Sequence, residues 1–228
     1  MKETFKNFLN NLKKENYYSG PTDENLEDSK SLEKELKRLQ KENETLKKPA
    51  RELAYSKFKS RRSIRKYSTK KVDWKLIYEI VTAALNAPSA GNIENTEIIV
   101  VQDKKIKNDI GRIETQQFWL SDAPYLLVFV RDDERLCELY PNNGEIYSIQ
   151  NTSAIIENVL MLAHFYDLGA CWVESSDSSV LKDLLGIPSS KFVDAVIPIG
   201  FPLENPSVIK AHEAAKLHFE KYGNKKRV

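Results

Sequence analysis

The sequence predicts a layered domain of the α/β or α+β class that follows a charged helical arm. Beyond residue 50, short apolar runs typical of buried strands alternate with longer stretches whose apolar residues recur at helical spacing. Residues 1–50 differ: they hold eleven Lys or Arg, ten Asp or Glu, and no Trp, Val or Ile. Such a segment buries too little apolar surface to form its own core. We therefore expect an arm over residues 1–50 and one globular domain over residues 51–228.

A short heptad pattern marks the second half of the arm. With Leu36 at position a, Leu32, Leu39 and Leu46 fall at d positions and Asn43 falls at another a position. About two heptads are fewer than the three or four that define a coiled coil, which favours a solvated helical arm. A single Asn at an a position is instead typical of a parallel two-stranded coil. Both interpretations stay open.

Within the globular part, local periodicity predicts the elements in chain order. Over Trp74–Asn86 the apolar residues share one helical face, and Lys104–Ile113 has the same spacing. Glu97–Val101 and Tyr125–Val130 are apolar runs with the length of buried strands. A long helix is predicted over Ile149–Leu168.

The remaining elements follow that helix. Gly169 is expected to be its C-cap, and Cys171–Glu174 is expected to be a strand. A helix over Ser178–Leu185, with Asp177 as its N-cap, precedes a strand over Ala195–Ile199. Helices and strands mixed on this scale indicate a layered domain.

Composition narrows the functional classes. The net charge of +2 gives no excess of basic residues for a polyanion, so we expect no nucleic-acid partner. Cys137 and Cys171 form no metal or redox motif, and the three histidines are too scattered for a metal site. The N-terminus lacks the apolar core of a signal peptide, and Ile149–Leu168 is too polar for a bilayer span. We therefore expect a soluble, cytoplasmic protein with no metal and no membrane partner.

A basic segment is the first candidate site. Eight basic residues and no acid lie between positions 57 and 71, centred on Arg61, Arg62, Ser63 and Arg65. In a nearly neutral chain this density indicates an anion site, because the planar arginine fork matches phosphate oxygens and a serine hydroxyl adds a donor. A basic run on its own is more often a solvated loop. Its meaning depends on the segments that accompany it.

Two further segments have the character of site loops. Ala87–Asn92 follows the first predicted helix and offers Ser and Asn side chains on a tight turn that Gly91 permits. Leu168–Ser175 joins a helix to a strand that leads into polar residues suited to a pocket. Cys171 within it is expected to be a small buried hydrophobe, because no basic residue lies near it in sequence.

Taken together and in this order, these segments resemble the FMN-dependent nitroreductase family. Two departures stand out: Ile93–Thr96 replaces a common Gln-Pro-Trp, and Asn151 replaces a common aspartate early in the long helix. The resemblance extends from Arg61 almost to the C-terminus and is carried by seven segments: Arg61–Arg65, Ala87–Asn92, Ala123–Pro124, Gly144–Tyr147, Leu168–Val173, Pro198–Pro202 and His218–Gly223.

The resemblance implies an α+β fold, a three-layer α-β-α sandwich, that forms an intertwined homodimer with two FMN sites at the interface. Arg61, Arg62 and Ser63 match the motif that holds the flavin phosphate, and Arg65 matches a residue at the pyrimidine edge. Pro88, Ser89, Ala90 and Asn92 match a loop that reaches the flavin from the partner subunit, and Glu174 and Ser175 match a backbone segment beside flavin N5. Gln116 falls near an amide that contacts the ring, and Lys210 falls at a second phosphate-binding cation.

The implied activity is hydride transfer from NADH or NADPH to FMN, followed by reduction of a nitroaromatic, quinone or similar small acceptor. Because the cofactor carries this chemistry, no catalytic side chain or triad is required. One alternative is a flavoenzyme of the same fold that performs reductive dehalogenation or flavin fragmentation. Another is a coiled-coil scaffold or regulatory protein that uses the arm. Residues 15–28 contain five acids and no Lys or Arg, which argues against a DNA-binding basic region ahead of the coil.

Overall fold

The computed structural model describes residues 34–39, 49–114, 117–207 and 216–225 of the chain. The chain divides into two units, Met1–Tyr55 and Ser56–Val228. None of the described helices has the length and apolar character needed to cross a membrane.

In the first unit, residues 34–39 and 49–55 are helical. Leu36 and Leu39 are about half exposed. Leu32, Asn43 and Leu46 of the heptad pattern lie outside the described residues. The coiled coil therefore stays a prediction.

The second unit is built on one antiparallel sheet. The strand order is β1-β2-β5-β3, and β4 also pairs with β5. The four predicted strand segments are found, with the one over Cys171–Glu174 shortened to two residues, and the strand at Gly169–Ala170 was not predicted. The strands are β1 (Thr96–Val101), β2 (Tyr125–Arg131), β3 (Gly169–Ala170), β4 (Val173–Glu174) and β5 (Phe192–Gly200).

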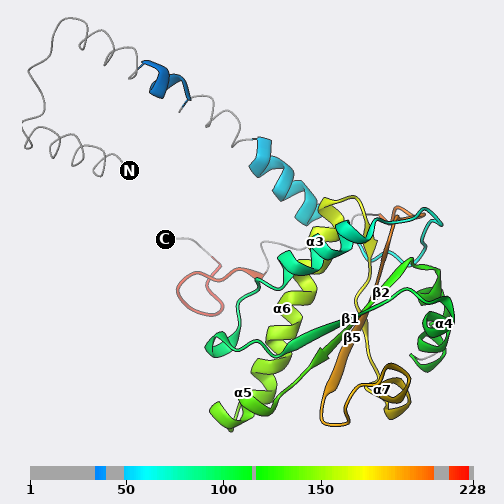
Figure 1. The fold of residues 1–228 in the computed structure, drawn as a ribbon. Coiled ribbons are helices and arrows are strands. Elements are labelled where there is room, and N and C mark those ends of the chain that lie inside the picture. The colour runs from blue at the N-terminus through cyan, green and yellow to red at the C-terminus, as the bar shows by residue number, and fades with distance from the viewer. Residues whose placement is uncertain (1–33, 40–48, 115–116, 208–215, 226–228) are drawn as a thin grey trace, which may run out of the picture. The chain divides into compact units, whose positions relative to one another are not determined.

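Helices cover both faces of this sheet (Figure 1). On one face lie α3 (Trp74–Ala84) and α6 (Gly144–Phe165), and their apolar residues form one core with the strands. On the other face lie α4 (Lys104–Ile113), the short helix η2 (Phe118–Asp122) and α7 (Ser179–Leu185), which form a second core. The arrangement is a three-layer α+β sandwich, which confirms the predicted fold class.

Strand β2 shows why the sequence has a continuous apolar run here. Every residue of β2 is buried. Leu127 and Phe129 pack under α3 and α6, whereas Leu126 and Val128 pack on the opposite face. Since both faces are covered, the usual alternation of apolar and polar residues is lost.

The end of α6 differs from the prediction. Its last helical residue is Phe165 and its C-cap is Tyr166, so Gly169 is not the cap. Gly169 lies in β3, where a Cβ atom would come within 2.7 Å of Ile64 Cγ2. The glycine is needed because the Ile64 side chain packs closely against it, not because a helix ends there.

The start of α7 also differs, by one residue. Its N-cap is Ser178, whose side chain accepts a hydrogen bond from the Leu181 N–H. Asp177 instead accepts from the Val193 N–H at 2.7 Å, which ties the loop to β5. Both residues are good caps by type, and the long-range bond to β5 decides between them.

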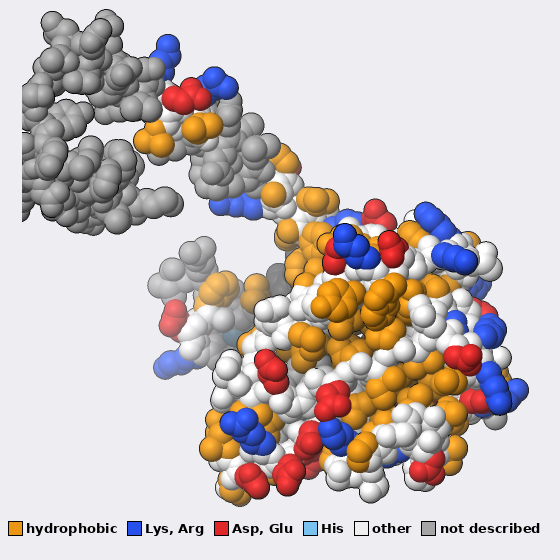
Figure 2. Space-filling model, in the orientation of Figure 1, with side chains coloured by type: hydrophobic (Ala, Val, Ile, Leu, Met, Phe, Trp, Pro, Cys, Tyr) orange, Lys and Arg blue, Asp and Glu red, His pale blue; other side chains and the backbone are white. Residues whose placement is uncertain are grey.

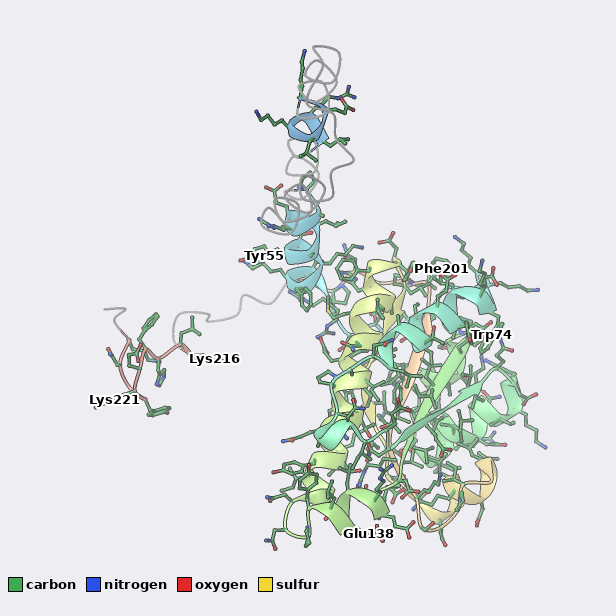
Figure 3. The ribbon with its side chains drawn as sticks, turned by 60° about the vertical axis from the view of Figure 1, so that its left-hand side comes forward. Tyr55, Trp74, Glu138, Phe201, Lys216 and Lys221 are labelled. Carbon is green, nitrogen blue, oxygen red and sulfur yellow. The ribbon has the colours of Figure 1, made fainter. Side chains whose placement is uncertain are left out.

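The two ends of the globular unit carry different elements (Figure 3). Trp74, at the start of α3, and Phe201, just after β5, lie toward one end. Glu138, on α5 (Glu134–Leu139), lies at the opposite end. The Ser68 N–H donates to the Phe201 carbonyl at 2.8 Å. The basic segment is therefore anchored at the Phe201 end.

Candidate functional site

The segment from Arg61 to Arg65 is fixed along the edge of the sheet. Ser63 forms a parallel bridge with Ala170, and the Ile64 N–H donates to the Ala170 carbonyl at 3.0 Å. The carboxylate of Glu204 accepts from the backbone N–H of Arg65 at 2.5 Å. These bonds hold the backbone of the segment in place and do not involve the arginine side chains.

Arg61 and Arg62 line a cavity of about 190 Å³. Arg61 Nε lies 3.9 Å from Glu157 Oε1. Arg62 donates from Nε to the Ser207 carbonyl at 3.1 Å and from Nη1 to the Lys59 carbonyl at 3.0 Å. Its Nη2 is buried and has no hydrogen-bond partner among the described residues. A buried donor of this kind fits an anion with several acceptor oxygens, such as a phosphate.

His164 and its partners Ser60 and Lys57 lie beside the same cavity. His164 lines it, and its Nε2 lies 2.8 Å from Ser60 Oγ. Burial lowers the pKa of His164, and the positive charge of Lys57 lowers it further. Lys57 Nζ in turn donates to the His164 carbonyl at 2.9 Å and to Asp167 at 2.7 Å. The carboxylates of Asp167 and Glu204 also line the cavity, but they are bonded to Lys57 and to the Arg65 N–H. The buried Nη2 of Arg62 is therefore the donor that this cavity offers to an anion.

Arg65 lines a second cavity, of about 460 Å³, together with Cys171, the residue that follows Ala170 of the bridge. Its guanidinium carbon lies 5.9 Å from the centre of the Trp119 ring. Cys171 also lines this cavity but is buried, and burial raises the pKa of its thiol. It is a packed thiol, as the sequence predicted.

Glu174 and Ser175 line this second cavity too. The Ser175 N–H donates to the Asp194 carbonyl of β5 at 3.2 Å, and the register pairs Glu174 with Ala195. In an antiparallel pair, hydrogen-bonded and non-bonded residue pairs alternate along the strand. The N–H of Glu174 therefore points away from β5, and it is the donor that this segment can offer to a ligand.

The loop from Pro88 to Asn92 lies elsewhere in the subunit. Pro88, Ser89 and Asn92 line a third cavity, of about 430 Å³, which shares no lining residue with the first two. Ala90 starts the short helix η1 (Ala90–Asn92), in which Gly91 has a φ of 61°. Within one subunit, Arg65 shares a cavity with Glu174 and Ser175, Arg61 and Arg62 line a separate cavity, and neither cavity includes this loop. Gln116 and Lys210 lie outside the described residues.

The two departures from the family pattern meet in this loop. The Asn151 side chain accepts from the Ala90 N–H at 2.9 Å and donates to Asn95 Oδ1 at 3.0 Å. It also donates to the Ile93 carbonyl at 3.3 Å. An aspartate could not donate these last two bonds. Asn151 therefore suits the segment Ile93–Thr96 that replaces the common Gln-Pro-Trp.

Sequence reasoning missed two carboxylates that hold the site in shape. Glu204 binds the backbone of the basic segment, and Glu114 binds Ser175 and Ser176. Glu114 is also 1% exposed, which nothing in its local sequence signals. In the described part of the chain, no three His, Cys, Asp or Glu residues are grouped as metal ligands.

Comparisons with known proteins agree with this geometry. A sequence model of the Nitroreductase family matches residues 58–119 and 111–201. A protein of Methanothermobacter thermautotrophicus, provisionally named an NADH dehydrogenase/NAD(P)H nitroreductase, is 32% identical over 168 residues, or 72% of this chain and 85% of that protein. The iodotyrosine deiodinase of Haliscomenobacter hydrossis is 26% identical over 177 residues, or 65% of this chain and 78% of that protein.

A solved structure of an FMN-dependent nitroreductase from Clostridium difficile has the same fold. Its TM-score is 0.63 at 27% identity, over 73% of this chain and 98% of that one. The family match itself spans more than half of the chain and contains Arg61–Arg65, the loop from Pro88 to Asn92 and the strand β4. The chain belongs to the nitroreductase family.

Proposed function

We propose that this protein is an FMN-dependent oxidoreductase that takes hydride from NADH or NADPH and reduces a nitroaromatic, quinone or similar small acceptor. The observation that carries the proposal is the pair of cavities that the Arg61–Arg65 segment lines next to its bridge with Ala170. One offers the unpartnered Nη2 of Arg62, and the other offers Arg65 and the N–H of Glu174. Family membership and the names of the relatives support it.

Each residue of the site has a proposed role. Arg61, Arg62 and Ser63 would hold the phosphate of FMN, with Lys210 as a further cation. Arg65 would bind the pyrimidine edge and stabilise the negative charge that a reduced flavin carries at N1. When bound, FMN supplies the hydride-accepting chemistry. The protein supplies binding, orientation and charge, with Gln116 near the ring and the backbone of Glu174 and Ser175 beside N5.

We also propose that the site is completed in a homodimer. Pro88, Ser89, Ala90 and Asn92 would reach the flavin of the partner subunit, which accounts for their separation from Arg65 within one subunit. Hydrophobic side chains gather on the face shown in Figure 2. Large apolar side chains on α3 and α6 are exposed and available for such an interface: Trp74, Tyr78, Ile146 and Ile149.

The arm should not be needed for this dimer. We expect a protein that lacks residues 1–48 to remain an FMN-loaded dimer with NAD(P)H oxidation largely intact, because about two heptads are too few to hold two chains together. Analytical ultracentrifugation with flavin absorbance recorded in the same run measures both properties. A colourless monomer would contradict the proposed interface and the division into an arm over 1–50 and a domain over 51–228.

A second candidate is reductive dehalogenation. It is favoured by the similarity to an iodotyrosine deiodinase. Incubating the reduced, FMN-loaded protein with iodotyrosine and measuring released iodide distinguishes the two activities. Both candidates require FMN that NADH, NADPH or another reductant can reduce, so the absorption spectrum of the purified protein tests them together.

A further inference from the structure

Glu114 is a buried carboxylate whose contacts the proposed function does not use. It lies directly after α4 as its C-cap, and it is 1% exposed. Its Oε1 accepts from Ser175 Oγ at 2.7 Å, and its Oε2 accepts from the Ser176 N–H at 2.9 Å. Both donors are neutral and both belong to the segment that follows β4. Burying a carboxylate is costly, so these bonds must be well formed to be retained.

These bonds fix the direction of three successive backbone N–H groups. The Ser175 N–H is held by the Asp194 carbonyl on β5, and the Ser176 N–H is held by Glu114 on the α4 side. Ser175 Oγ also accepts from the Asp177 N–H at 3.1 Å. The chain after Glu174 is therefore held by β5 on one side and by Glu114 on the other, an arrangement of hydrogen bonds that we call the clamp. The Glu174 N–H is left pointing away from β5, in a segment that lines a cavity together with Arg65.

Glu114 also brings a negative charge to that cavity. Glu114 and Arg65 both line it. In a partly desolvated site, charges act more strongly on each other and on a ligand than they do in water. A cation there favours the reduced, negatively charged flavin, and an anion opposes it.

We propose that Glu114 is a positioning residue that aims the Glu174 N–H at the flavin, and that its charge offsets that of Arg65 and so sets the flavin potential. This inference rests on the proposed function for the choice of ligand. The clamp itself is a property of the protein without a cofactor. The two parts can therefore be tested separately.

The clamp is tested by amide hydrogen exchange of the full-length apoprotein. We expect Glu114→Ala to speed exchange of the Ser176 N–H by at least ten-fold, because that N–H loses its acceptor. Glu114→Gln can still accept from Ser176 and donate to Ser175, so exchange should stay close to that of the parent. Unchanged exchange in Glu114→Ala would overturn the positioning role.

The charge is tested by the midpoint potential of bound FMN in the full-length protein. Glu114→Gln should raise the ratio of affinities for reduced and oxidised FMN by about ten-fold, which is about +30 mV for a two-electron couple. Arg65→Ala should shift the potential in the opposite direction. Asp133→Asn, which removes a buried carboxylate outside this cavity, is the matched control and should leave the potential close to that of the parent.

Two failures are distinguishable. If the parent protein binds no FMN, the proposed function is wrong, and the exchange experiment still decides whether the clamp exists. If the parent binds FMN and Glu114→Gln shifts the potential no more than Asp133→Asn does, the electrostatic role of Glu114 is wrong and the proposed function stands.

Discussion

Replacing Arg61 with alanine is expected to weaken FMN binding by roughly ten- to a hundred-fold, and Arg65→Ala should have an effect of similar size. The estimate is the loss of one charge-assisted hydrogen bond, about 1.5–3 kcal/mol. The two variants should act differently. Arg61 lines the smaller cavity, where we place the phosphate, so its loss should affect phosphate binding alone. Arg65 lines the larger cavity, so its loss should also lower the flavin potential.

Equilibrium titration of apoprotein with FMN and with riboflavin measures these losses. Arg61→Ala should weaken FMN binding and leave riboflavin binding nearly unchanged, since riboflavin lacks the phosphate. Arg112→Ala is the matched control, because Arg112 is an exposed arginine paired with Asp109 on α4. If Arg61→Ala and Arg65→Ala bind FMN as Arg112→Ala does, the assignment of the site is wrong.

Replacing Arg131 with methionine should reduce the free energy of unfolding by about 3–5 kcal/mol, because it leaves the buried carboxylate of Asp133 and the partly buried carboxylate of Asp194 without their cation. The Arg131 side chain is 6% exposed and bonds to Asp133 and, at 2.6 Å, to Asp194. Its guanidinium also lies 4.5 Å from the centre of the Phe192 ring. Methionine replaces much of the apolar part of the arginine side chain. Most of the lost stability should therefore come from removing the positive charge that faces Asp133 and Asp194.

This loss should depend on pH. Burial raises the pKa of Asp194, and the hydrogen bond from Arg131 lowers it. Without Arg131 the folded-state pKa rises further, so the folded variant binds a proton more tightly than the unfolded chain does. The destabilisation should then be largest at neutral pH and shrink as the pH falls through the raised pKa.

Urea unfolding of the parent and of Arg131→Met at pH 7 and pH 5 measures both effects. The double variant Arg131→Met/Asp194→Asn should recover part of the stability at pH 7 by removing one of the unpaired charges. A loss below about 1 kcal/mol at pH 7, or a loss that grows as the pH falls, would contradict this account of the buried charges.

Local sequence patterns predicted most helices and strands of the globular unit because each pattern reflects burial of one element. Lys104–Ile113 is helical over the predicted residues. The long helix starts earlier than predicted, at Gly144, because the buried face of its first turns consists of Gly144, Ser148, Asn151 and Thr152 and gives no apolar signal. A Cβ at Gly144 would come within 2.5 Å of Leu136 O. Only the packed structure shows that this close approach lets α6 begin there.

The site was predictable to the extent that it is local in sequence. Arg61, Arg62, Ser63 and Arg65 form one run that can be recognised as an anion segment. The bonds from Glu114 to Ser175 and from Glu204 to Arg65 join residues 61 and 139 positions apart. No local pattern specifies such partners, because the sheet and its edges bring them together. The resemblance to a known family predicted the cofactor. Only the packed structure shows that Glu114 and Glu204 bond to the segments of the candidate site.

The central claim is tested most directly by the absorption spectrum of the purified full-length protein, recorded without oxygen before and after NADH or NADPH is added. The protein should be yellow with a flavin spectrum, its visible absorbance should bleach on addition of at least one of the two nucleotides, and the chromophore released by denaturation should be FMN. A colourless protein that also fails to bind added FMN at micromolar concentration would contradict the assignment of this chain as a flavin-dependent oxidoreductase.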